Sequence, residues 1–363
     1  MRYGTCVAPL AIAQPHATSG GEAERNQIAS TTALIAPPIV NWPHSARRRS
    51  VLCLTSRFHD ACRIAAVNAS TVARSTNADY CAGVLWKPMP NKPSSAVGPI
   101  GMFDSGFGGL TVARAVIDLL PAEDVVYIGD TGRYPYGNKP AEQVREYARE
   151  LAWSLVRDFN AKLVVIACNT AASVALHELS KELPVPVLGV VEPGARALVR
   201  ATHNRKVGVI GTVGTISSGA YVRAITNTHA DVTLTSAACP GFVEFVERDQ
   251  TSGDEVTVLA ERLLAPVRDA GVDALLLGCT HYPYLSRVIG EVMGPKVVLV
   301  SSGDETAFAV RDALSESGMA ATSGVGSHRF LSSGDVAWFA QLGRRLLGPE
   351  LDHAEQWSVN SHS

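Results

Sequence analysis

Two stretches of the chain share one pattern: residues 163–170 read Leu-Val-Val-Ile-Ala-Cys-Asn-Thr, and residues 274–281 read Ala-Leu-Leu-Leu-Gly-Cys-Thr-His. Each is a short apolar run followed by a small residue and a cysteine. Near-continuous apolar runs of this length are typical of strands buried on both faces of a parallel sheet. The two cysteines, Cys168 and Cys279, lie 111 residues apart, about the length of one domain. The repeated pattern therefore predicts two similar halves.

Further apolar runs predict the other strands of this architecture: residues 99–103, 124–128, 187–191, 207–210, 232–235 and 297–300. Between them lie helical stretches, most clearly residues 141–159, whose apolar side chains recur with the helical period. The alternation predicts an α/β fold of two similar doubly wound parallel-sheet domains that face each other across a cleft. Ligands bind such sheets beyond the carboxyl ends of the strands, so functional residues are expected there.

The composition, with 46% hydrophobic and 18% charged residues, is that of a globular protein with a sizeable core. It excludes global disorder, collagen and a disulfide-dense mini-domain. No apolar run reaches the ~18 residues of a membrane span, so no membrane partner is expected. The net charge of −2 argues against a nucleic-acid partner.

Residues 1–96 differ from the rest of the chain. They carry ten basic and four acidic residues, a net charge of +6, which leaves −8 for the remainder. They lack sustained periodicity, so we expect a disordered N-terminal extension. A targeting segment, a small folded module and a mis-assigned translation start are the alternatives. The spacing of Cys53, Cys62 and Cys81 matches no zinc pattern and indicates free thiols.

A glycine-rich turn follows the first predicted strand, with the sequence Asp104-Ser105-Gly106-Phe107-Gly108-Gly109. Such a turn before a helix presents backbone N–H groups to an anion. It lacks both the Walker and the dinucleotide spacing, and its size suits a carboxylate or a single phosphate. Asp104 would then grip an ammonium or tune a neighbour's proton affinity; the alternative is a helix cap. The loop of residues 129–137 is either a clamp over the site or an ordinary connection.

Two thiols at equivalent strand ends limit the possible chemistry. A disulfide is disfavoured without a convincing secretion signal, and Cys168, Cys279 and His281 make an incomplete zinc site. A single nucleophilic cysteine would leave the second without a role. Acid–base chemistry uses both, because one thiolate can remove a proton from a carbon while the opposite thiol delivers one to the other face. A free thiol pKa of about 8.5 makes both states accessible. Cys239 lacks the strand-end context and is interpreted as structural.

Five stretches together resemble the glutamate racemases, a family within the aspartate/glutamate racemase superfamily: residues 103–110, 135–137, 167–171, 191–194 and 277–283. The resemblance implies racemisation of L- and D-glutamate by two bases, without cofactor or metal. The D-glutamate would supply peptidoglycan synthesis and so cell wall biogenesis and cell shape. It also implies a split layout, with residues 97–193 and 303–348 in one α/β domain, 194–302 in the other, and 349–363 as a C-terminal tail.

The resemblance also implies roles for individual residues. Cys168 would take the α-proton from D-glutamate and Cys279 from L-glutamate, assisted by Asp104 and His281 respectively, with Glu247 as an acidic residue near the second thiol. Substrate binding would fall to Asp104, Ser105, Tyr136, Gly137, Asn169, Thr170, Thr280 and His281. The chain departs from the family at two places: Glu244 stands where Pro is usual, and Gly132-Arg133-Tyr134 replaces an Ala-Arg-hydrophobic pattern.

The sequence leaves other functions open. One is a racemase of the same superfamily that acts on aspartate or another amino acid. Another is a regulatory binding protein on this scaffold, and a third is a single-cysteine hydrolase. The resemblance implies that binding to DNA gyrase is possible, but no feature of the sequence supports it. We expect a cytoplasmic homodimer whose partner is the small-molecule substrate glutamate.

Overall fold

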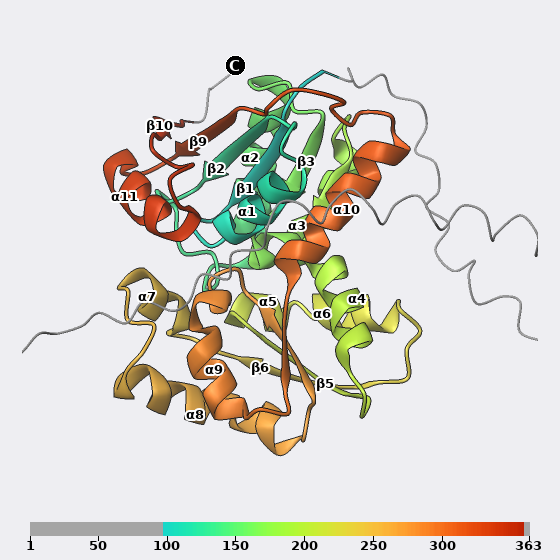
Figure 1. The fold of residues 1–363 in the computed structure, drawn as a ribbon, viewed down its shortest axis with the longest axis vertical. Coiled ribbons are helices and arrows are strands. Elements are labelled where there is room, and N and C mark those ends of the chain that lie inside the picture. The colour runs from blue at the N-terminus through green and yellow to red at the C-terminus, as the bar shows by residue number, and fades with distance from the viewer. Residues whose placement is uncertain (1–96, 359–363) are drawn as a thin grey trace, which may run out of the picture. The chain divides into compact units, whose positions relative to one another are not determined.

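Two parallel β-sheets organise residues 97–358, the part of the chain that the computed structural model describes (Figure 1). The predictions for residues 1–96, including the three cysteines there, lie outside this range. Sheet A has the strand order β10-β9-β2-β1-β3-β4, and sheet B has the order β6-β5-β7-β8. Every pairing between these strands is parallel. The predicted α/β fold class with two similar parallel sheets is confirmed.

The strands of sheet A are β1 (Ile100–Asp104), β2 (Val125–Gly129), β3 (Leu163–Ile166), β4 (Val187–Gly189), β9 (His328–Ser332) and β10 (Glu355–Gln356). Those of sheet B are β5 (Lys206–Gly211), β6 (Thr233–Ala238), β7 (Ala274–Gly278) and β8 (Val298–Ser301). The first four strands of each half follow the same spatial order, second-first-third-fourth. Strands β3 and β7, which precede the two cysteines, therefore occupy equivalent places.

Helices cover both faces of each sheet (Figure 1). Those beside sheet A are α1 (Leu110–Leu119), α2 (Ala141–Arg157), α3 (Asn169–Glu182), α10 (Ser302–Glu316) and α11 (Val336–Leu347). Those beside sheet B are α4 (Val191–Ala201), α5 (Val213–Ser217), α6 (Ala220–Thr226), α7 (Phe242–Glu247), α8 (Asp254–Asp269), the 3₁₀ helix η1 (Tyr282–Leu285) and α9 (Ser286–Met293). In each sheet the strand order reverses direction after the second strand, so right-handed connections place helices on both faces. No helix among residues 97–358 is long and apolar enough to cross a membrane.

The structure corrects four of the sequence predictions. The strand expected over 232–235 is β6, which runs to Ala238. The run 187–191 is a strand only to Gly189, because Val190 caps helix α4 and Val191 begins it. The helix expected over 141–159 ends at Arg157. Strands β9 and β10 were not predicted. The domain boundaries inferred from the resemblance remain a prediction.

A buried ion pair joins the amino-terminal ends of two strands of sheet A. Lys162 precedes β3 and Glu123 precedes β2; each side chain is 3% exposed, and Nζ lies 2.6 Å from Oε2. The ammonium also donates to the carbonyl of Met319 at 2.8 Å, and Glu123 Oε1 accepts from the amide of Ala321 at 2.6 Å. The pair therefore ties the connection after α10 to the amino-terminal ends of the strands of sheet A. Cys168 lies at the opposite, carboxyl-terminal ends of these strands.

Replacing Lys162 by methionine is expected to lower the free energy of unfolding by about 3–5 kcal/mol, because it leaves a buried carboxylate without its counter-charge. Equilibrium unfolding in urea measures this loss. The double variant Lys162→Met/Glu123→Gln is the control: it restores most of the stability, since the uncharged amide still accepts from Ala321. A single variant as stable as wild type would contradict the expectation.

Candidate active site

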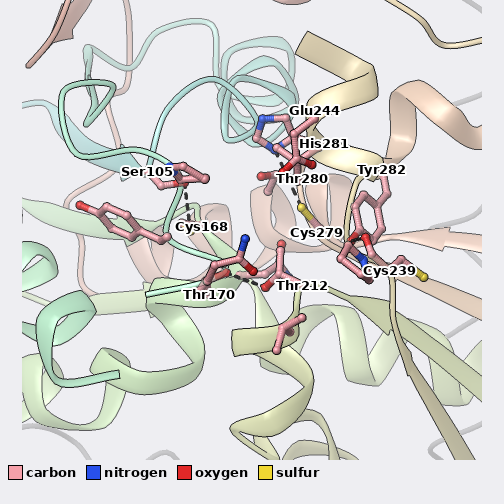
Figure 2. Close-up of a pocket in the computed structure, with 18 of the residues that line it drawn as sticks. Ser105, Cys168, Thr170, Thr212, Cys239, Glu244, Cys279, Thr280, His281 and Tyr282 are labelled. Atoms are coloured by element: carbon pink, nitrogen blue, oxygen red, sulfur yellow. Dashed lines mark hydrogen bonds between the residues drawn. The ribbon is translucent and has the colours of Figure 1, made fainter. Parts of the chain in front are cut away.

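The carboxyl ends of the central strands converge on one pocket, which Figure 2 shows with its lining side chains. Cys168 follows β3 and Cys279 follows β7, so each sheet contributes one thiol from its equivalent strand. The two cysteines are buried, with 5% and 6% of their surfaces exposed, and are not joined by a disulfide. The pocket thus has one thiol on the wall formed by each half.

Cys168 caps the first turn of α3, and its sulfur accepts a hydrogen bond from the amide of Ala171 at 3.5 Å. The thiol donates toward Ser105 Oγ at 3.7 Å. Burial, reinforced by the negative charge of Asp104, raises the pKa of Cys168 to about 12. The thiol form is thereby favoured at rest, and an activating partner is needed to draw its proton.

Asp104 ends strand β1 and is 1% exposed. Its Oδ1 accepts from the amide of Gly106 at 2.8 Å, and its Oδ2 accepts from Thr280 Oγ1 at 3.4 Å, which links the two halves. Burial raises the pKa of Asp104, against the opposing effects of the nearby His281 and of these hydrogen bonds. Asp104 begins the glycine-rich turn but is not part of the pocket lining.

His281 lies next to the second thiol, with Nδ1 3.8 Å from Cys279 Sγ. On its other side, Nε2 lies 3.4 Å from Glu247 Oε1. Burial acts to lower the pKa of His281, but the contact with Cys279 and the ion pair with Glu247 outweigh it and raise the pKa to about 10. The imidazole is therefore protonated at neutral pH and places a positive charge beside the Cys279 sulfur.

The remaining predicted binding residues all lie in the pocket lining: Ser105, Tyr136, Gly137, Asn169, Thr170, Thr280 and His281. Asn169 donates from Nδ2 to the Tyr221 hydroxyl at 2.7 Å, whereas its Oδ1 is buried and has no hydrogen-bond partner within residues 97–358. Thr170 Oγ1 lies 3.0 Å from Thr212 Oγ1 and therefore joins α3 to the start of α5. Glu247, like Asp104, stands behind the lining rather than in it.

Sequence reasoning missed several lining residues, among them Thr212 and Glu244, whereas Tyr134 lies in the loop that was considered as a clamp. Thr212 directly follows β5, so the same strand-end rule that singled out the cysteines could have found it. Glu244 on α7 is the departure from the family pattern, and it forms no ion pair with any residue that the structure describes. Figure 2 labels it beside His281.

Cys239 directly follows β6 and lines the pocket, so the expectation that it lacks the strand-end context is wrong. Its carbonyl accepts the Tyr282 hydroxyl at 2.9 Å, and burial raises the pKa of its thiol to about 12. Among residues 97–358, no group of three or more His, Cys, Asp or Glu side chains is arranged to hold a metal ion.

Comparison with known proteins gives the class. The family model described as Asp/Glu/Hydantoin racemase matches residues 109–310. The glutamate racemase of Corynebacterium diphtheriae is 50% identical over 261 residues, which cover 72% of this chain and 98% of that protein. The chain belongs to the Asp/Glu/hydantoin racemase family.

Two solved structures narrow the class. The glutamate racemase of Thermus thermophilus, in complex with beta-chloro-D-alanine, is 43% identical with a TM-score of 0.66, covering 73% of this chain and 98% of that one. That of Francisella tularensis, in complex with D-glutamate, is 32% identical with a TM-score of 0.69, covering 74% and 100%. Within the family the chain belongs to the glutamate racemases, which are isomerases.

Proposed function

We propose that the pocket interconverts L- and D-glutamate by acid–base chemistry between Cys168 and Cys279. The observation that carries the proposal is that equivalent strands of the two sheets, β3 and β7, each end in a buried cysteine in the lining of one pocket. We assign residues 97–193 with 303–348 to the half that holds Cys168, and residues 194–302 to the half that holds Cys279. A relative's complex with D-glutamate supports the choice of substrate.

In one direction, the Cys168 thiolate takes the α-proton of D-glutamate, so that the C–H bond breaks and an S–H bond forms. The electron pair left on the α-carbon spreads into the adjacent carboxylate. The Cys279 thiol then donates its proton to the opposite face, which yields L-glutamate and leaves Cys279 as the thiolate. The reverse reaction begins from that state. Each thiol is base in one direction and acid in the other.

The surroundings of the pocket can stabilise the charge that develops. Backbone N–H groups at the start of α3 and in the glycine-rich turn favour a carboxylate, and fixed donors of this kind act strongly in a site shielded from water. The free Oδ1 of Asn169 suits the substrate ammonium. Asp104 would draw the proton of Cys168, and His281 with Glu247 would stabilise the Cys279 thiolate. Thr170, Thr280, Ser105, Tyr136 and Gly137 complete the binding surface.

We also place the reaction in the cytoplasm, in a homodimer, where the D-glutamate supplies peptidoglycan synthesis. The direct test follows the optical rotation of each glutamate enantiomer in D₂O, with α-deuterium content measured by NMR. Both enantiomers are expected to racemise and to gain α-deuterium. Faster turnover of L-aspartate or L-alanine than of L-glutamate would contradict the substrate, and racemisation without exchange would contradict the chemistry.

The protonation of His281 predicts a pH dependence. Since the pKa of His281 is raised to about 10, the imidazolium persists through neutral pH and loses its proton as the pH rises through 10. We expect kcat/KM to fall on the alkaline side near that pH. In Glu247→Gln the carboxylate that stabilises the imidazolium is gone, so the alkaline limb should move to lower pH. An alkaline limb at the same pH in both proteins would show that Glu247 does not act through His281.

A further inference from the structure

The loop of residues 130–139, between β2 and α2, forms one wall of the pocket. Five successive residues of this loop line the pocket, from Tyr134 to Asn138, and two of them, Tyr136 and Gly137, are assigned above to substrate binding. The loop carries neither cysteine. Its position therefore determines how the substrate is held, while the thiols are placed by other elements.

One buried carboxylate organises this loop. Asp130 is 0% exposed, and its Oδ2 accepts both Arg133 Nε at 2.7 Å and the Tyr136 hydroxyl. Its Oδ1 accepts from Ser333 Oγ at 2.6 Å. Ser333 Oγ also accepts the amide of Gly132 at 2.9 Å. The pocket wall is thus folded around Asp130 and fastened to the end of β9, some 200 residues along the chain.

The guanidinium of Arg133 connects this loop to the C-terminal segment. Its central carbon lies 4.1 Å from the ring centre of Tyr147, on α2, and 5.8 Å from that of Trp357. It also forms an ion pair with Glu150. A guanidinium within about 6 Å of an aromatic face is attracted to it. Arg133 is therefore held between helix α2 and Trp357 while it binds Asp130.

Trp357 is itself held firmly in place. Only 4% of its surface is exposed, and it follows β10, which pairs in parallel with β9. Its backbone amide donates to the carbonyl of Ser332 at 2.8 Å, and its indole Nε1 donates to Ser154 Oγ at 2.9 Å. Trp357 and Ser332 lie beyond residue 310, where the match to the family model ends, whereas Ser154 lies within the matched range.

We propose that Trp357 is a positioning residue for substrate binding: through Arg133 and Asp130 it holds the loop so that Tyr136 and Gly137 meet the substrate. The proposal rests on the function proposed above, because it takes glutamate to occupy this pocket. The two thiols follow β3 and β7 and do not depend on this loop for their positions. Loss of the tryptophan therefore weakens substrate binding far more than it slows proton transfer.

The test is steady-state racemisation of both glutamate enantiomers by Trp357→Ala and Trp357→Phe. In the alanine variant we expect KM to rise by about tenfold or more while kcat changes by less than about threefold, since loss of binding that is equal in the ground state and the transition state raises KM alone. The phenylalanine variant keeps an aromatic face beside Arg133, so its KM should stay within about threefold of wild type. If the alanine variant does not fold, Trp357→Leu retains the apolar volume without the ring and is expected to show the same rise in KM.

Trp153 offers a matched control. It stacks under Arg157 at 4.2 Å and donates its indole N–H to Glu182 at 2.6 Å, but it is not part of the pocket lining. Trp153→Ala removes a comparable contact between an arginine and a tryptophan ring. It is expected to lower the melting temperature without raising KM. An unchanged KM in Trp357→Ala and Trp357→Leu would overturn the positioning role, as would an equal rise in Trp153→Ala. A wild-type enzyme inactive on glutamate would instead contradict the proposed function.

Discussion

Replacing either Cys168 or Cys279 by serine is expected to reduce racemisation by about a thousandfold or more, because proton transfer by a positioned side chain contributes 10²–10⁴-fold. A serine hydroxyl fits the space of the thiol but ionises far less readily. If the two cysteines act as a pair, the loss of either one stops inversion. Circular dichroism of the product measures the loss, and full activity in either variant would contradict the two-base reaction.

Rates alone cannot assign each thiol to an enantiomer. The two enantiomers have equal free energies in water, so the equilibrium constant is one and every variant has equal kcat/KM in both directions. Isotope exchange makes the assignment. In Cys168→Ser, the remaining Cys279 should still exchange the α-proton of L-glutamate with D₂O without inverting it, while D-glutamate should not exchange. Cys279→Ser should show the reverse, and exchange of the same enantiomer in both variants would refute the assignment.

Cys239 provides the control for these variants. It is a buried free thiol that lines the same pocket, but it follows β6, which is the counterpart of β2 and not of β3. Cys239→Ser is expected to keep its activity within about threefold of wild type, since a residue outside the proton path contributes nothing to that transfer. A large loss in this variant would show that serine substitution disturbs the pocket itself.

Asp104→Asn is expected to lower kcat by about a hundredfold, the scale of one acid–base group. The asparagine keeps the shape, and its Oδ1 can still accept from Gly106. What disappears is a buried carboxylate whose pKa is raised by burial, which makes it a better proton acceptor than an exposed aspartate. The result discriminates between two roles. Were Asp104 only a nearby charge, its removal would lower the pKa of Cys168 and speed the reaction.

The initial rate of each variant, measured from pH 6 to pH 9, tests this prediction. Asp118→Asn is the control, since Asp118 lies on helix α1 with 62% of its side chain exposed and pairs with Arg114. Its rate should equal that of wild type. A rate for Asp104→Asn at or above wild type would show that the carboxylate does not take part in proton transfer.

The sequence predicts those strands whose surroundings are uniformly apolar. Strands β3 and β7 are buried along their whole length, so their residues form continuous apolar runs. Strand β9 escapes prediction because its sequence His-Arg-Phe-Leu-Ser begins with two polar residues. Arg329 pairs with Glu355 on the two-residue edge strand β10, at 2.9 and 2.6 Å. Polar residues at a sheet edge interrupt the apolar run on which the prediction depends.

The prediction of the boundary between β4 and α4 is wrong for a related reason. Val190 and Val191 are 0% and 2% exposed, because the first turn of α4 is buried. Over so few residues an apolar run cannot distinguish a buried helix start from a strand. The sequence therefore places the boundary two residues too late, although it identifies both elements.

The residues of the site also fall into two groups, those that the sequence could identify and those that it could not. Residues that lie one or two positions beyond a strand, such as Cys168 and Cys279, could be identified because the α/β fold itself brings strand ends together. Contacts between loops could not: nothing local indicates that Asp130 accepts from Ser333, or that Trp357 lies beside Arg133. The catalytic and binding roles of the site residues remain predictions.

The place of Trp357 has a practical consequence. Indole emission responds to nearby cations and to the polarity of its surroundings, and this indole lies beside the guanidinium that steadies the pocket loop. With Trp153 and Trp338 replaced by phenylalanine, Trp357 is the one tryptophan left among residues 97–358, and Trp42 and Trp86 can be replaced likewise. Its fluorescence then serves as a native optical signal for ordering of the loop, so that ligands can be screened and their binding rates timed without an added dye.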